Sequence, residues 1–221
     1  MNNERMSNAQ IPQHTVRHTT RDGVDVAIVE VRRTYPGEVA DVWEAFTNPE
    51  RLPRWFLPVT GDLRPGGQYQ LEGNAGGSVT HCDPPHSFSV TWELMGFVSW
   101  VTVDLTTAGP DRTTVTLAHT VDTDSDHWRQ FGPAAVGIGW DLAWVRGLQP
   151  FLRGNVPDSQ AEQMWPLSSE GTAFVRACAD SWAEAEIAGG GDPQTARERS
   201  AATAAFYTTP PAEQADRTEE S

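Results

Sequence analysis

The chain has 221 residues, of which 38% are hydrophobic, and a formal net charge of −14 at pH 7. This length suits one full-sized hydrophobic core and is short for two. The acidic balance disfavours nucleic acid and anionic membrane as partners, because both are bound through basic surfaces. All 16 basic residues are arginine, so no lysine amine is available to form a Schiff base.

Both ends of the chain are polar and poor in large apolar side chains. Residues 1–22 and 208–221 cannot offset their ordering entropy by burial, so we expect both segments to be disordered. The two cysteines, Cys82 and Cys178, lack the spacing of a metal site, which is typical of reduced proteins. The sequence shows no signal-like N-terminus and no apolar run of ~20 residues. We therefore expect a cytoplasmic protein that does not enter a membrane.

The first predicted elements are a strand and two short helical turns. Residues 24–35 alternate β-branched and polar side chains, which predicts a strand. Positions 39–46 carry apolar residues at i, i+3, i+4 and i+7, the pattern of one helical stripe. Asn48 and Pro49 can start a further helical turn, because proline suits the first helical position. The apolar residues of that turn are Leu52, Trp55 and Phe56.

Five segments between residues 61 and 120 alternate apolar and polar side chains. Turn-forming sequences rich in Pro, Gly and Asp separate them, and no helix intervenes, so we expect an antiparallel meander. Each strand has one apolar face, which predicts a sheet with one dry side. The sets that share a face are Tyr69 and Leu71; Phe88, Val90 and Trp92; Val101, Val103 and Leu105; and Val115, Leu117 and His119.

A long helix is predicted after the meander, over residues 133–152. Its apolar side includes Trp140, Trp144 and Phe151. The glycines at 137, 139 and 147 each weaken the helix by about 1 kcal/mol relative to alanine, so tertiary packing must hold it. Small residues at these positions would let the helix approach the sheet closely or would leave room beside it.

The C-terminal part of the chain predicts a linker and two more helices. Residues 154–170 look like the linker, and residues 171–187 carry Phe174, Cys178 and Trp182 at i, i+4 and i+8. Such a stripe should not stay exposed. The helix therefore covers a cavity mouth, crosses the back of the domain, or joins two copies in a homodimer. A final helix begins at Asp192-Pro193 and ends near residue 207.

The order of these elements resembles the helix-grip, or START-like, fold of the SRPBCC superfamily. The resemblance is strongest to the bacterial branch named after the activator of heat-shock-protein-90 ATPase, and it covers about half the chain. It rests on the segments RTYPGEVADVWEAFTNPERLPRWF (33–56), DLRPGGQY (62–69), GSVTHCDPPHSFSVTW (77–92), TTVTLAHT (113–120) and GWDLAWVRGL (139–148).

The resemblance implies an α+β fold in which a curved antiparallel sheet wraps around a long C-terminal helix. We expect this helix-grip domain to span residues 23–153, with the extra C-terminal helices forming an extension over residues 171–207. It also implies a cavity between sheet and helix that binds a small apolar or aromatic ligand. The predicted cavity residues are Trp55, Phe56, Tyr69, Leu71, Trp92, Val103, Leu117, His119, Trp140 and Trp144.

Core packing alone would explain any one of these aromatic residues. Taken together they suggest more, because nine tryptophans are many for this length and each buried indole N–H needs a partner. The resemblance places Trp55 and Phe56 at the cavity mouth and the tryptophans of the long helix opposite them. A pocket with such walls would suit a flat, apolar ligand.

Few residues suggest catalysis, a metal or a cofactor. We expect no metal and no cofactor, whereas the sequence leaves open whether the protein catalyses a reaction. A lone histidine such as His119 is more often a satisfied core group than a catalyst. His14 and His18 lack an acidic partner at metal-binding spacing. Cys82 could pair with His119 as a nucleophile, although nothing in the spacing requires it. The direction of His81 stays open, because a β-bulge would reverse its face.

Three functions remain open at the level of sequence. The first is ligand binding without catalysis, with His119 or Tyr69 orienting the ligand. The second is an enzyme that resembles polyketide cyclases or aromatases. A conjunction of His119, Tyr69 and an acid around one pocket would favour it, and a wholly apolar pocket would not. The third is a protein-interaction role as a chaperone ATPase regulator, which the family name suggests.

Overall fold

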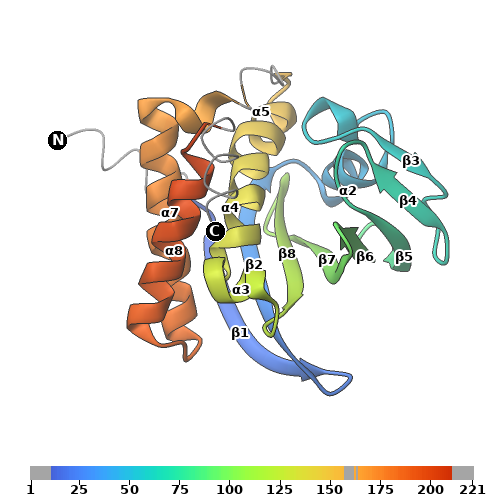
Figure 1. The fold of residues 1–221 in the computed structure, drawn as a ribbon. Helices are drawn as coiled ribbons and strands as arrows, with labels where there is room; N and C mark the ends of the chain where they lie inside the picture. The colour runs from blue at the N-terminus through green and yellow to red at the C-terminus, as the bar shows by residue number, and fades with distance from the viewer. Residues whose placement is uncertain (1–10, 157–161, 163, 211–221) are drawn as a thin grey trace.

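The computed structural model describes residues 11–156, 162 and 164–210 of the protein. The disorder expected for residues 1–10 and 211–221 lies outside these described residues. A curved sheet and a long helix that lies against it form the centre of the fold (Figure 1). Two further helices, α7 and α8, lie side by side along the long helix, opposite strands β3 to β6.

The sheet has eight strands in the order β1-β2-β8-β7-β6-β5-β4-β3, and every neighbouring pair is antiparallel. The predicted meander is therefore confirmed, and its last strand pairs with the first predicted strand. The strands are β1 Gln13–Arg21, β2 Val24–Pro36, β3 Val59–Gly61, β4 Gln68–Leu71, β5 Gly76–Asp83, β6 Ser87–Leu94, β7 Phe97–Thr107 and β8 Arg112–Asp122.

Strand β1 corrects the expectation that the first 22 residues are disordered. Residues 13–21 pair with β2 along their whole length, from Gln13 opposite Arg32 to Arg21 opposite Val24. Only one aliphatic side chain of β1, that of Val16, is buried. Backbone hydrogen bonds to β2 and packing against α7 order this strand, and neither contribution is visible in its composition.

The long helix is present where it was predicted, but it is not a uniform α-helix. It consists of α4 Ala134–Leu142, the π-helical segment η2 Ala143–Leu148 and α5 Gln149–Leu152, and we call residues 134–152 the closing helix. Two glycines of the closing helix let neighbouring residues pack directly against its backbone. A Cβ atom on Gly147 would lie 2.2 Å from the carbonyl oxygen of Trp55, and one on Gly137 would lie 2.3 Å from the Trp182 ring.

The remaining helical elements are mostly short. The predicted helix after β2 is α2 Val39–Thr47, whereas the turn that follows it is the 3-10 helix η1 Leu52–Arg54. Helix α3 Asp126–Phe131 was not predicted; Ser125 caps it by accepting a hydrogen bond from the Trp128 N–H. A further 3-10 turn, η3, spans Trp165–Leu167.

The C-terminal extension packs against the back of the domain. Helix α7 spans Ser169–Ala188 and α8 spans Pro193–Tyr207, so the linker ends earlier than residue 170. The predicted stripe on α7 is buried, with 3% of Phe174 and none of Cys178 or Trp182 exposed. Because α7 contacts β1 and α4 of its own chain, the stripe needs no second subunit to cover it.

Candidate functional site

A cavity of about 290 Å³ lies between the concave face of the sheet and the closing helix, and we call it the main cavity. The sheet, α2, the η1 region and α4 all contribute to its wall. Every side chain that lines it is uncharged. They are Trp43, Phe46, Thr47, Leu52, Trp55, Phe56, Val59, Leu63, Tyr69, Leu71, Val79, Cys82, Pro84, Phe88, Val90, Trp92, Val101, Val103, Leu117 and Trp140.

Eight of the ten predicted cavity residues line the main cavity, and His119 and Trp144 do not. Trp144 is fully buried, and its ring meets the ring of Tyr35 edge-on, with centroids 6.0 Å apart. Trp140 and Trp144 were placed on one side because they are four residues apart. Positions i and i+4 of a helix differ by about 40° in direction, so Trp144 meets Tyr35 while Trp140 reaches the main cavity.

His119 lies behind the cavity wall and orients Trp140. The Trp140 indole N–H donates to His119 Nδ1 at 3.2 Å, and His119 Nε2 lies 2.8 Å from the Ser99 hydroxyl. Because an indole nitrogen can only donate, Nδ1 accepts and Nε2 carries the proton. Burial lowers the pKa of His119 to about 3, so the ring is neutral at physiological pH. No nitrogen of His119 is therefore free to accept a proton from a ligand or from Cys82.

Two further polar groups of the wall are hydrogen-bonded to the backbone of the protein. The Tyr69 hydroxyl donates to the carbonyl oxygen of Thr91 at 2.7 Å, and the Trp55 indole donates to the carbonyl oxygen of Ala45 at 2.8 Å. Burial and the nearby Glu93 carboxylate raise the pKa of Tyr69. The wall therefore offers an apolar ligand aromatic and aliphatic surface.

A β-bulge decides which residue of β5 faces the main cavity. The pairing of β5 with β6 shifts between Val79 and His81, so that Cys82 lies opposite Phe88 and both line the cavity. His81 is exposed on the other face, which settles the direction that the sequence left open. Burial, followed by the charge of Asp83, raises the pKa of the Cys82 thiol, so the thiol is protonated and weakly nucleophilic.

The residues that sequence reasoning missed in the wall carried a usable signal. Phe88, Val90 and Val101 belong to the same alternating apolar faces as the predicted Trp92 and Val103. Trp43 and Phe46 belong to the apolar stripe that predicted α2. Leu52 belongs to the short helical turn that the sequence predicted together with Trp55 and Phe56. Strand β3, which supplies Val59, was not predicted, because it is too short for a periodic pattern.

A second cavity of about 230 Å³ shares Trp55 and Phe56 with the main cavity as wall residues. Unlike the main cavity, it contains charged side chains. Arg146 of the closing helix donates from Nε and Nη2 to the two carboxylate oxygens of Glu162, at 2.6 and 2.8 Å. The residues that line this second cavity are Pro53, Arg54, Trp55, Phe56, Leu57, Leu142, Ala143, Arg146, Gly147 and Glu162.

The back of the closing helix carries a buried polar network that the sequence did not reveal. Asp141 of the closing helix is fully buried. Its carboxylate oxygens accept from His14 Nε2 at 2.8 Å and from the Trp182 indole at 2.9 Å. His14 Nδ1 lies 2.9 Å from the Ser181 hydroxyl, and the His14 ring stacks on Trp182. The network thus joins β1, the closing helix and α7.

The His14 ring connects the Ser181 hydroxyl to the Asp141 carboxylate, as the histidine of a serine hydrolase triad does. The backbone around Ser181, however, does not fit a hydrolase active site. Ser181 lies inside the 20-residue helix α7, where the backbone N–H groups are used by the helix itself. The backbone there cannot supply an oxyanion hole. We therefore interpret the network as a structural link between the domain and its extension.

In the part of the chain that the structure describes, no three His, Cys, Asp or Glu residues are grouped in a way that could hold a metal ion. Within the same residues, every helix is too short or too polar to cross a lipid bilayer.

Solved structures with similar folds include CalU16 from Micromonospora echinospora, which is known from a crystal and from solution. The crystal structure is 28% identical, covers 79% of this chain and 97% of CalU16, and has a TM-score of 0.65. The solution structure is 29% identical, covers 81% of this chain and 97% of CalU16, and has a TM-score of 0.68. DynU16, a protein in the dynemicin biosynthetic locus, is 25% identical over 59% of this chain and 48% of its own, with a TM-score of 0.52.

EF2215 from Enterococcus faecalis shares the fold, with a TM-score of 0.57 at 13% identity over 82% of this chain and 99% of its own. No curated protein sequence matches the chain. The family model described as activator of Hsp90 ATPase homolog 1-like protein matches residues 37–152, which is just over half of the chain. The protein therefore belongs to this family and to the SRPBCC superfamily, with the helix-grip fold.

Proposed function

We propose that this protein binds a small, largely apolar ligand in the main cavity and carries out no chemical step on it. The observation that carries the proposal is the uncharged, mostly aromatic and aliphatic wall of a cavity of about 290 Å³. Burial of apolar surface contributes roughly 25 cal/mol per Å², and aromatic walls favour flat ligands. A cavity with few polar groups is typical of ligand sites.

The relatives support a role with small molecules. DynU16 lies in a biosynthetic locus, where a protein that holds a small molecule would be used. The likeness to CalU16 covers more of the chain than the family model does, so it includes residues outside 37–152. The C-terminal extension contributes no residue to the wall of the main cavity, so the proposal rests on the helix-grip domain.

An enzyme of the cyclase or aromatase kind is the weaker candidate. It would need His119, Tyr69 and an acid around one pocket. His119 lies behind the wall with both ring nitrogens hydrogen-bonded, and the Tyr69 hydroxyl is bonded to a backbone carbonyl. None of the residues that line the main cavity is acidic. The role as a chaperone ATPase regulator stays a prediction, because no contact described above bears on a protein partner.

The first test is native mass spectrometry of freshly purified protein, followed by denaturing extraction. A discrete, stoichiometric mass that is lost on denaturation would support the proposal. The second test is a fluorescence titration with the neutral probe N-phenyl-1-naphthylamine, which should bind saturably at one site per chain. Absence of both a bound mass and saturable probe binding would contradict the proposal.

A variant pair locates the binding in the main cavity. Val103→Phe adds a ring inside the cavity, whereas Thr106→Phe adds the same ring on the exposed face of the same strand. We expect Val103→Phe to weaken probe binding about tenfold or more and Thr106→Phe to leave it unchanged. Should Val103→Phe fail to fold, Leu71→Phe at another position of the wall serves the same purpose. Equal binding by both folded variants would place the probe elsewhere.

A further inference from the structure

Trp55 and Phe56 form a partition between two cavities of opposite character. The main cavity has no charged side chain in its wall, whereas the second contains two guanidinium groups and one carboxylate. The second cavity therefore carries a formal charge of +1 in a chain whose net charge is −14. Long-range attraction of anions by this protein is weak, so a preference for an anion must come from local contacts.

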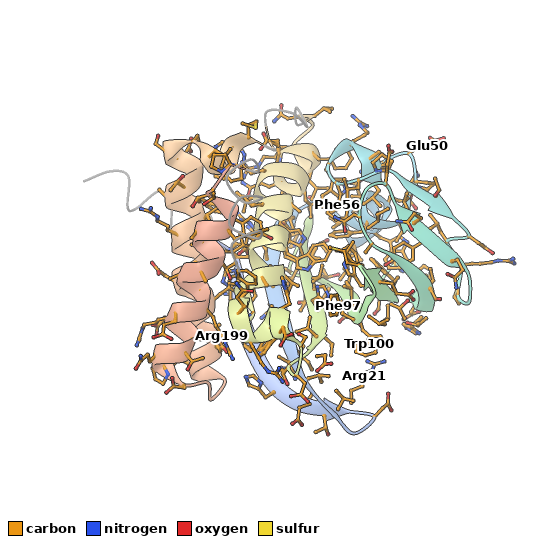
Figure 2. The ribbon with its side chains drawn as sticks, in the orientation of Figure 1. Arg21, Glu50, Phe56, Phe97, Trp100 and Arg199 are labelled. Carbon is orange, nitrogen blue, oxygen red and sulfur yellow. The ribbon has the colours of Figure 1, made fainter. Side chains whose placement is uncertain are left out.

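Of the two residues of the partition, Phe56 is the one whose side chain makes no hydrogen bond. It is partly exposed, stacks on the Trp140 ring with centroids 5.7 Å apart, and contacts the tilted Trp55 ring at 5.5 Å. Figure 2 shows Phe56 between the closing helix and the region of α2. The backbone beside it is fixed, because the Trp55 indole is bonded to Ala45 and the Trp55 carbonyl lies against Gly147. Phe56 is therefore the less constrained of the two residues that both cavities share.

Arg146 is preorganised to receive a carboxylate or a similar planar acid. Its guanidinium lies 4.5 Å from the centroid of the Trp165 ring, and it binds Glu162 through two hydrogen bonds. This two-bond geometry is the one that arginine uses for carboxylate ligands. Arg54 lines the same cavity and stacks on Phe151 at 5.2 Å. The Glu162 carboxylate therefore occupies the position that a ligand's acidic group would take.

We propose that the ligand is an amphipathic monoanion with a flat apolar body in the main cavity and an acidic end between Arg54 and Arg146 in the second. The acidic end displaces Glu162 from Arg146, and Phe56 turns aside to let the ligand pass the partition. This inference rests on the proposed function, because it concerns the ligand of the same site. It makes the second cavity the element that distinguishes acids from neutral molecules of the same shape.

Two naphthalene probes of similar shape test the proposal. 8-Anilinonaphthalene-1-sulfonate carries the acidic group, and N-phenyl-1-naphthylamine lacks it. We expect the wild-type protein to bind the sulfonate more tightly than the amine. Arg146→Gln and, separately, Arg54→Gln should weaken sulfonate binding about tenfold, since each removes a charged hydrogen-bond donor, and should leave amine binding unchanged. Glu162→Gln should strengthen sulfonate binding several-fold, because it removes a competing carboxylate.

Arg112→Gln, which removes an exposed arginine outside both cavities, is the matched control and should change neither affinity. Thermal melts of all variants confirm that the probes report on folded protein. Sulfonate binding that is insensitive to Arg54, Arg146 and Glu162, or that is no tighter than amine binding, would overturn the inference and leave the proposed function intact. Failure of both probes to bind the wild-type protein would contradict the proposed function itself.

Discussion

Asp141→Ala would remove the acceptor that joins β1, the closing helix and α7. The Asp141 carboxylate is fully buried and accepts one hydrogen bond from His14 and one from Trp182. Without it, two buried donors lose their acceptor, at about 1–3 kcal/mol each. The free energy of unfolding should therefore fall by about 2–6 kcal/mol, a large part of the 5–15 kcal/mol that is usual for proteins. For a chain of this size, this corresponds to a fall in Tm of roughly 5–20 °C.

Urea unfolding followed by tryptophan fluorescence measures this loss. Asp180→Asn, an exposed change on α7, is the control and should alter stability by less than about 0.5 kcal/mol. Asp141→Asn should give an intermediate loss, because its amide keeps one acceptor oxygen. If Asp141→Ala cost less than about 1 kcal/mol, the link between the domain and its extension would not contribute as the hydrogen bonds indicate.

Three further predictions follow from burial and close packing. The pKa of His119 is about 3 in the folded protein and 6.5 in its ordinary state, so the unfolded chain binds the additional proton between these values. The stability that neutral His119 contributes is complete above pH 6.5 and declines as the pH falls towards 3, by about 2 kcal/mol at pH 5. The free energy of unfolding, measured by urea melts, should fall less between pH 7 and pH 5 for His119→Gln than for the wild-type protein. An equal fall in both proteins would refute this. Gly147→Ala should lower the unfolding free energy by about 1–3 kcal/mol and alter binding of both naphthalene probes, because its Cβ would meet the Trp55 carbonyl at 2.2 Å. If this variant kept the probe affinity and Tm of the wild-type protein, the close packing of Gly147 against Trp55 would not matter for stability or binding. Deletion of residues 167–221 should cause aggregation or a large loss of Tm, because it uncovers the surfaces that Phe174 and Trp182 bury. Unchanged solubility and Tm would contradict the structural role of the extension.

The sequence by itself determined the features that depend on local pattern. Alternation along the strands predicted which side chains face the closing helix, and the 3.6-residue period predicted the helices. The element order and the matching segments led to the helix-grip fold. Eight of the ten predicted cavity residues line the main cavity. The resemblance implied the cavity and placed Trp55 and Phe56 at its mouth, and the apolar faces of the strands and the helix supplied the other six.

The tertiary structure decided everything that depends on contacts distant in sequence. His14 and Asp141 are 127 residues apart and Asp141 and Trp182 are 41 apart, so no local pattern could pair them. Strand β1 is polar, and its order comes from β2 and α7. A bulge turned Cys82 inward, and Trp144 packs edge-on against Tyr35 instead of lining the main cavity. Each of these outcomes depends on which surfaces come into contact after folding. Composition and periodicity describe only local sequence, so they cannot predict such contacts.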